Sequence, residues 1–254
     1  MRYGVIGVGY WGRKHVEELN EIGVVPYIAD SDEGKLKELQ EGISKWYDRP
    51  YELEGMTTDY RKLLEDSEIE AVSICTPNRT HYQICKEALE AGKHVFIEKP
   101  MTLDYKEALE LVELAKEKDR FLAVGHIFRY DNTIRKARQL VSSGELGEVY
   151  TVSLRWLNYE EPWDRDIIFD LATHPFDIIH FIFGEHPDEI NCIGEVYRKD
   201  EGEEAAFVNA KLGKMLVNME MSWLTPEKTR EVRITGSDKE AYIDCVNQEI
   251  HVYD

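Results

Sequence analysis

The sequence lacks the features that mark secreted, membrane-spanning or metal-binding chains. It has four cysteines, and none of them stands in a CxxC pair. We therefore expect reduced thiols, with neither a disulfide nor a metal site. No apolar run approaches about 20 residues, and no charged n-region precedes the first apolar run, which predicts neither a membrane span nor a signal peptide. We expect a cytoplasmic protein.

Positive charge is also scarce. The chain carries 31 Lys and Arg against 50 Asp and Glu, for a formal net charge of -19. A chain of this charge repels polyanions, so nucleic acid is not an expected partner. Its 254 residues are enough for two modest domains, each with its own core.

The first half alternates short apolar runs with helical periodicity, the pattern of a parallel sheet covered by helices. Strands are predicted in RYGVIGVG, VVPYIAD, EAVSICTP, HVFIEKP and FLAVGHIF. A helix is predicted to begin after Asp104, because Glu107 follows three residues later in a capping-box arrangement. This half predicts an α/β domain over residues 1–121, a doubly wound parallel sheet of the Rossmann type.

The second half, residues 122–254, has the period of strands joined by turn residues. It predicts an α+β domain with an open, mostly antiparallel sheet, accompanied by helices in DNTIRKARQLVSSG and HPFDIIHFIFG. In MLVNMEMSW, alternate residues place Met215, Val217, Met219, Met221 and Trp223 on one face. We expect a second subunit to bury this face, and hence a homo-oligomer, a dimer or tetramer, built through the open sheet.

A Gly-x-Gly-x-x-Gly motif, Gly7, Gly9 and Gly12, lies between the first predicted strand and the first predicted helix. The first glycine permits a tight turn, the second lets a pyrophosphate approach the backbone, and the third lets helix and strand pack closely. The free N–H groups of the helix then bind the anion. Tyr10 and Trp11 are expected to cover the cofactor, and packing in the core is the alternative for both.

Asp30 ends the next predicted strand, about 20 residues beyond the glycines. Its carboxylate is predicted to accept hydrogen bonds from the adenosine ribose hydroxyls and to repel a 2′-phosphate. No arginine follows it, so NAD is the expected cofactor rather than NADP. A plain turn or helix-cap role is the alternative for this aspartate.

Polar residues follow two later predicted strands. The first group is Thr76, Pro77 and Asn78 with His81, and the second is Glu98, Lys99 and Pro100. Ligands of doubly wound sheets bind beyond the carboxyl ends of the strands, where both groups fall. Taken alone, Lys99 is better explained as an exposed surface lysine, the commonest place for that residue. His15, within the first helix, is predicted to be a core histidine.

These strand-end groups, after an N-terminal glycine motif, resemble the Gfo/Idh/MocA family of sugar and inositol dehydrogenases over nearly the whole chain. The D-x-G-x-H pattern of that family is matched by Asp170 and His174 and is followed by Asp177, with Ala172 where the family usually has Gly. The resemblance implies an NAD-dependent dehydrogenase in which Thr76, Pro77, Asn78, His81, Glu98 and Lys99 contact the cofactor.

Oxidation of an alcohol requires a base near neutral pKa for the O–H proton, which histidine provides, and we assign this role to His174. The resemblance implies that Lys99 stabilises the developing alkoxide. Asp170 is expected to orient the imidazole or to hold a substrate hydroxyl. His180, one turn beyond Asp177, is expected to be structural rather than a metal ligand.

The segments GHIFRYDNTIRKA and LGEVYTVSLRW are similar to a branch of the family that oxidises the 3-hydroxyl of nucleotide-linked N-acetylhexosamines. A UDP-sugar carries a pyrophosphate, for which Arg129, Arg155 and Arg165 are the candidate cations. Trp163 is a candidate for stacking on the uracil or the sugar. Ordinary surface ion pairing is the alternative for the arginines. Inositol and free sugars remain open as substrates, and so does an NAD-binding regulator without turnover.

Overall fold

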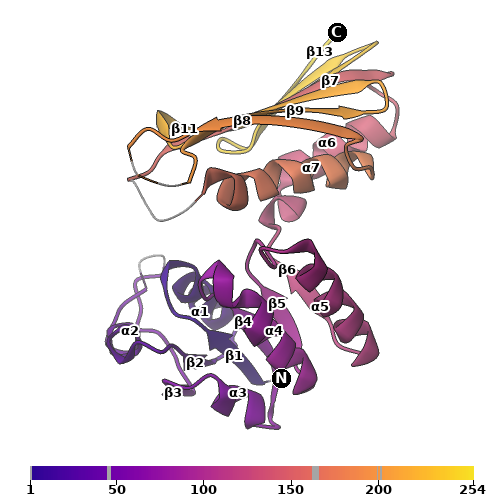
Figure 1. Cartoon of the computed structure of the whole chain (residues 1–254). Helices are drawn as coiled ribbons and strands as arrows, with labels where there is room; N and C mark the ends of the chain where they lie inside the picture. The colour runs from indigo at the N-terminus through magenta and orange to yellow at the C-terminus, as the bar shows by residue number, and fades with distance from the viewer. Residues whose placement is uncertain (1, 45–46, 162–165, 199, 201) are drawn as a thin grey trace. The chain divides into compact units, whose positions relative to one another are not determined.

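The computed structural model describes residues 2–44, 47–161, 166–198, 200 and 202–254. The chain divides into two compact units, Met1–Gly125 and His126–Asp254 (Figure 1). The first unit ends four residues beyond the predicted residue 121, because β6 (Leu122–Val124) pairs with β5 (His94–Ile97) and completes its sheet. Among the described residues, no helix has the length and apolar character that crossing a bilayer requires.

The first unit is a parallel sheet of six strands in the order β3-β2-β1-β4-β5-β6, as predicted. Its other strands are β1 (Arg2–Ile6), β2 (Tyr27–Ala29), β3 (Gly55–Thr57) and β4 (Ile69–Ile74). Its helices are α1 (Tyr10–Glu21), α2 (Glu33–Gln40), α3 (Arg61–Glu65), η1 (Asn78–Thr80), α4 (His81–Glu90) and α5 (Tyr105–Glu117).

Alternate strand residues form two cores, one on each face of this sheet. Val5 and Ile28 pack with residues of α1 and α2, whereas Ile6 and Ile74 pack with residues of α4 and α5. The start of α5 is confirmed, since the Asp104 side chain accepts hydrogen bonds from the backbone N–H groups of the first helical turn. Helices on both faces are the layering of a doubly wound fold.

The second unit is a sheet of seven strands in the order β13-β12-β11-β7-β10-β9-β8. The strands are β7 (Val149–Tyr159), β8 (Glu189–Glu195), β9 (Ala205–Leu212), β10 (Met215–Ser222), β11 (Leu224–Gly236), β12 (Glu240–Asp244) and β13 (Glu249–Tyr253). The helical segments are η2 (Ile127–Tyr130), α6 (Asn132–Ser142), η3 (Ile168–Ala172) and α7 (Thr173–Phe183). The pairing is antiparallel, as predicted, except that the central strand β7 runs parallel to β10.

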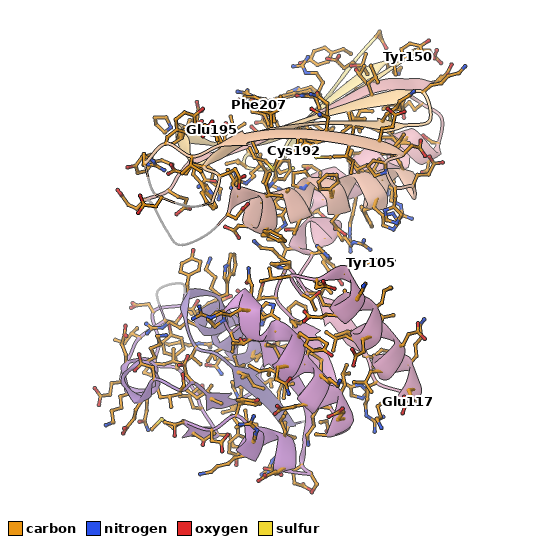
Figure 2. All side chains as sticks on the ribbon, in the orientation of Figure 1. Tyr105, Glu117, Tyr150, Cys192, Glu195 and Phe207 are labelled. Carbon is orange, nitrogen blue, oxygen red and sulfur yellow. The ribbon has the colours of Figure 1, made fainter. Side chains whose placement is uncertain are left out.

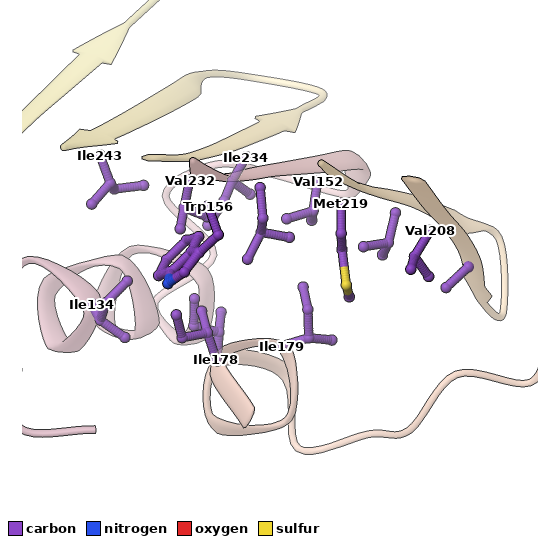
Figure 3. Packing of buried hydrophobic residues seen from close by; sticks show 14 of the residues in the cluster. Ile134, Val152, Trp156, Ile178, Ile179, Val208, Met219, Val232, Ile234 and Ile243 are labelled. Carbon is purple, nitrogen blue, oxygen red and sulfur yellow. The ribbon is translucent and has the colours of Figure 1, made fainter. Parts of the chain in front are cut away.

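The apolar face of β10 is buried, but not by a second subunit. Met219 and Met221 are fully buried within the chain's own core, together with Trp156 of β7 and Ile178 and Ile179 of α7. Figure 3 shows the side chains of the sheet directed at α6 and α7. The argument for an oligomer from this face is therefore wrong, since the two helices already cover it, and the oligomer itself stays a prediction.

The opposite face of the second sheet carries no helix in the described part of the chain. It is largely polar, with Asn218 of β10 donating to Asn209 of β9 at 3.0 Å. Three apolar side chains, Ile193, Leu216 and Phe207, are more than half exposed there. Figure 2 labels Phe207 on the side of the sheet away from α7. The uncovered face thus has few large apolar groups.

Candidate active site

The carboxyl ends of four neighbouring strands bring the predicted cofactor residues to one edge of the first sheet. Backbone hydrogen bonds continue past the strands, from Cys75 N–H to Ile6 O at 2.8 Å and from Glu98 N–H to Ile74 O at 3.0 Å. Parallel strands end at the same edge, where ligands of such sheets bind. The residues gathered there are Gly7, Gly9, Gly12, Asp30, Thr76, Pro77, Asn78, Glu98 and Lys99.

The glycine loop has the geometry that a dinucleotide requires. Gly7 has φ +88°, and a Cβ on Gly12 would lie 1.8 Å from the Gly7 carbonyl oxygen, so larger residues are excluded at both positions. A Cβ on Gly9 would meet no heavy atom within 4 Å, so the protein itself leaves this space open. Helix α1 begins next to it with no side-chain cap and no acidic residue in its first turn. The loop therefore fits a pyrophosphate.

Tyr10 and Trp11 stand exposed at the start of α1 rather than in the core. Tyr10 is 70% exposed and Trp11 37% exposed, with ring centroids 5.3 Å apart. The Lys14 ammonium lies 4.7 Å from the Tyr10 ring centroid and 5.0 Å from that of Trp11. Both rings are thus available at the edge where the glycine loop lies, and core packing is excluded for Tyr10.

Asp30 has a structural role in addition to its predicted one. Its two carboxylate oxygens accept hydrogen bonds from Val8 N–H at 2.9 Å and Asp32 N–H at 3.0 Å. It therefore ties the glycine loop to the end of β2. The turn role and the ribose role are compatible, since a carboxylate has about four lone-pair sites.

An arginine does lie beside this loop, although none follows Asp30 in the sequence. Arg13 Nε donates to Val8 O at 3.3 Å, and its two terminal nitrogens contact the Glu38 carboxylate at 2.8 and 2.7 Å. The hydrogen bond to Glu38 raises the pKa of Arg13. Sequence reasoning missed this cation because it precedes Asp30, directly after the third glycine of the motif.

His81 is not presented at the edge of the sheet. Its side chain is fully buried, with Nδ1 2.8 Å from Pro100 O and Nε2 2.9 Å from Thr76 O. Burial lowers its pKa, and the two carbonyl groups and the Glu98 charge oppose this lowering. His81 was predicted to contact the cofactor. In the structure it instead contacts the backbone after two strands, β4 and β5.

His15 contacts polar groups in the first unit, which sequence reasoning missed. Its Nε2 lies 2.8 Å from Glu98 Oε1, and its Nδ1 lies 3.0 Å from Ser73 Oγ. The available signal was its place on α1, one turn beyond Gly12, on the side of the helix that faces the strand ends. His15 therefore contacts Glu98, the residue directly before Lys99, in addition to its packing role.

In the second unit, His174 lies in the first turn of α7. Its ring centroid is 5.1 Å from that of Phe128, which in turn is 5.1 Å from that of Trp156. Asp170 lies in η3, a single π-helical turn directly before α7. Such turns are frequent at functional sites. Asp170 and His174 are therefore held by one continuous helical segment.

Of the predicted phosphate-binding arginines, the two that the structure describes, Arg129 and Arg155, lie on different parts of the second unit. The Arg129 guanidinium contacts the Asp177 carboxylate at 2.6 to 3.0 Å. Arg155 lies on the uncovered face of the sheet, opposite to the helices, and pairs with Glu220 at 2.9 Å. Its second contact, with Glu231, is 3.4 Å long. Trp163 and Arg165 lie outside the described residues. Arg129 and Arg155 both form ordinary ion pairs, which is the alternative that the sequence left open.

Arg230 of β11 is a partly buried cation that the sequence did not reveal. Its terminal nitrogens donate to Leu157 O and Asn158 Oδ1, both at 2.7 Å. Burial lowers its pKa to about 10, and the negative charges of Glu160 and Asp170 act against this lowering. Arg230 thus lies within electrostatic range of Asp170. Within the described ranges, no three His, Cys, Asp or Glu side chains are arranged to hold a metal ion.

Comparison with known proteins identifies both units. Residues 1–126 match the model of an oxidoreductase family with an NAD-binding Rossmann fold, and residues 134–242 match the GFO/IDH/MocA C-terminal domain. The UDP-N-acetylglucosamine 3-dehydrogenase of Acidithiobacillus ferrooxidans is 31% identical over 254 residues, covering 100% of this chain and 77% of that protein. The chain belongs to the Gfo/Idh/MocA family.

Other Gfo/Idh/MocA relatives have different substrates in their names. The myo-inositol 2-dehydrogenase of Thermotoga maritima is 30% identical over 219 residues, covering 82% of this chain and 63% of that protein.

A solved structure of the Acidithiobacillus ferrooxidans enzyme superposes with a TM-score of 0.84 at 30% identity, covering 100% of this chain and 80% of that one. The protein is therefore an NAD-binding oxidoreductase, and its first unit is the Rossmann domain of the family.

Proposed function

We propose that the protein oxidises a secondary hydroxyl of a sugar, with a UDP-linked N-acetylhexosamine as the substrate. The observation that carries the proposal is the place of Lys99, buried directly after β5 at the strand-end edge that holds the glycine loop. The UDP-N-acetylglucosamine 3-dehydrogenase that matches the whole chain supports this substrate class.

The chemistry assigned to the residues follows from the needs of alcohol oxidation. Bound NAD supplies the acceptor for the hydride that leaves the carbon. His174 accepts the hydroxyl proton as a general base, and the Lys99 ammonium stabilises the negative charge that develops on the oxygen. Asp170, in the turn that precedes α7, orients the imidazole or holds a neighbouring hydroxyl of the sugar.

An uncharged cyclic polyol is the second candidate substrate. Arg129 and Arg155 each contact a carboxylate, so neither is ready for a pyrophosphate without breaking an ion pair. A substrate without phosphate avoids this cost. The myo-inositol 2-dehydrogenase relative is consistent with such a substrate.

The test is NADH formation with UDP-N-acetylglucosamine, myo-inositol and glucose. His174→Ala and Lys99→Ala are expected to lower turnover at least about 100-fold, the lower range for loss of a general acid or base. His180→Ala, a matched change on the same helix, should retain turnover. The NAD dissociation constant should change little in His174→Ala.

Two results would change the proposal. Near-native turnover of His174→Ala on a verified substrate would remove its role as the base. Tight NAD binding without turnover of any of the three compounds would favour an NAD-binding regulator.

A further inference from the structure

Lys99 lies between two residues that each contact a histidine. On one side, His15 Nε2 is 2.8 Å from the Glu98 carboxylate. On the other side, His81 Nδ1 is 2.8 Å from the carbonyl oxygen of Pro100. The two histidines come from different helices, α1 and α4. The segment from residue 98 to residue 100 is therefore fixed from two directions.

The contact of His15 is one link in a chain of polar groups that crosses the domain. Ser73 Oγ lies 3.0 Å from His15 Nδ1 and 3.0 Å from the Tyr3 hydroxyl. Ser73 is 2% exposed and Glu98 9% exposed. Hydrogen-bonded chains in such surroundings hold each member in one geometry, because an unmatched buried polar group is costly. Glu98 is thus tied to strands β1 and β4.

The contacts of His81 join the two strand ends that flank the site. Its Nε2 is 2.9 Å from Thr76 O, after β4, while its Nδ1 faces the residue after Lys99. Both partners are carbonyl oxygens, which only accept hydrogen bonds. A neutral imidazole donates to only one of them, so His81 holds the segments that follow β4 and β5 by one hydrogen bond and by its buried position between the two carbonyl groups.

Neither histidine lies within the glycine loop, and the function so far described leaves both unused. Gly125 lies close to the same segment, since a Cβ there would lie 3.1 Å from Glu98 Oε2. A lysine ammonium is carried on a flexible four-carbon stem, so movement of the backbone beneath it would add to the range of positions that the ammonium takes. A rigid backbone at Lys99 narrows the range of positions of its ammonium.

We propose that His15 and His81 are positioning residues for Lys99, which they hold at the reacting carbon by fixing Glu98 and Pro100. The proposal rests on the catalytic role that Lys99 has under the proposed function. The proposal gives neither histidine a contact with the substrate, so their effect is exerted on the transition state through Lys99.

The variants are His15→Gln and His81→Gln, each of which retains one hydrogen-bonding amide. A displacement of about 1 Å at a reacting group costs about 100-fold in rate, so we expect kcat to fall about 10- to 100-fold in each. KM and the NADH dissociation constant, measured by fluorescence, should stay within about twofold, because only a transition-state contact is lost. The substrate is whichever of UDP-N-acetylglucosamine, myo-inositol and glucose gives the highest turnover.

His94→Gln is the matched control. His94 begins β5, the same strand that ends before Glu98, and its Nδ1 accepts from Phe121 N–H at 3.0 Å. Its loss disturbs the strand without touching the segment of Lys99, so kcat should remain at the native value. His15 is partly exposed, so His15→Gln carries the test if the fully buried His81→Gln does not fold.

Combination with Lys99→Ala separates positioning from general damage. If the histidines act through Lys99, His15→Gln in the Lys99→Ala background should cause no further loss of kcat. Losses that multiply would overturn the proposal, and so would native kcat in both single variants.

A crystal structure of His15→Gln distinguishes this inference from the proposed function. Displacement of Lys99 Nζ by about 1 Å supports the positioning role even if Lys99→Ala keeps its turnover, in which case only the catalytic assignment is lost. An unmoved Lys99 overturns the inference and leaves the catalytic assignment intact.

Discussion

Replacing Asp30 with Asn tests how the protein distinguishes NAD from NADP. The native carboxylate accepts two backbone N–H groups, and Asn keeps one acceptor oxygen for one of them. The carboxylate is also the charged acceptor predicted for the ribose hydroxyls, and loss of one hydrogen bond to a charged group costs about 1.5 kcal/mol, so NADH affinity should fall about 10-fold. The change also removes a negative charge from the position predicted for the ribose hydroxyls.

The expected gain for NADPH follows from Coulomb's law. Two unit charges about 6 Å apart interact by about 1 to 3 kcal/mol when the effective dielectric lies between 80 and 20. Relief of about 2 kcal/mol raises NADPH affinity about 30-fold. Glu38→Gln in the same chain should add to this gain, because it frees the Arg13 guanidinium from its two-point contact.

The assay is titration of NADH and NADPH by the fluorescence of the bound nicotinamide. Glu33→Gln is the matched control, since it breaks an exposed pair with Lys37 on the same helix without touching the glycine loop. A ratio of NADPH to NADH dissociation constants that stays native in Asp30→Asn would refute the ribose role of Asp30. A native ratio in Glu38→Gln would refute only the expectation that a freed Arg13 guanidinium increases NADPH affinity.

Three further predictions concern stability, reactivity and assembly. Arg198→Ala should lower the free energy of unfolding by about 3 kcal/mol in thermal melts, because it leaves the fully buried Glu204 carboxylate without its guanidinium. Burial raises the pKa of Glu204, but hydrogen bonds from two backbone N–H groups and the Arg198 contact lower it overall, so its contribution should be present above the unfolded pKa and lost as pH falls through the lower folded one. Burial raises the pKa of Cys85 to about 12, so iodoacetamide at pH 8 should label the exposed Cys192 first, as peptide mass spectrometry can show. If the uncovered sheet face holds a second copy, light scattering should report an oligomer that Phe207→Glu dissociates, and a native chain that stays at 29.6 kDa would contradict this.

The sequence predicted those parts of the fold that depend on local pattern. The order of strand, glycine turn and helix at Gly7 is confirmed, and so is the start of α5 after Asp104. Alternation correctly placed Met219 on a buried face, yet it could not name what covers that face, because periodicity reports burial and not the partner. The short β3 and β13 carry too little pattern to be recognised and were not predicted.

The parts of the candidate site that follow from the order of strands and helices could be predicted. The contacts between side chains that are far apart in the sequence could not. Strand ends of a parallel sheet meet at one edge, so Lys99 and the glycine loop were expected together. The pair of Arg129 and Asp177 joins residues 48 positions apart, and no local pattern reveals it. The same holds for His81, whose two backbone partners become visible only when β4 and β5 are aligned.

The parallel pairing of β7 and β10 has a consequence for how the chain is made. Strand β7 occupies the middle of its sheet, but its neighbours β10 and β11 begin only at Met215 and Leu224. During synthesis, both edges of β7 therefore emerge from the ribosome well before any strand can pair with them. Unpaired strand edges attract other chains, and non-local pairing is slow. A translational pause or truncation before residue 215 should thus make nascent chains of this protein prone to aggregation, whereas loss of the edge strand β13 should be far better tolerated.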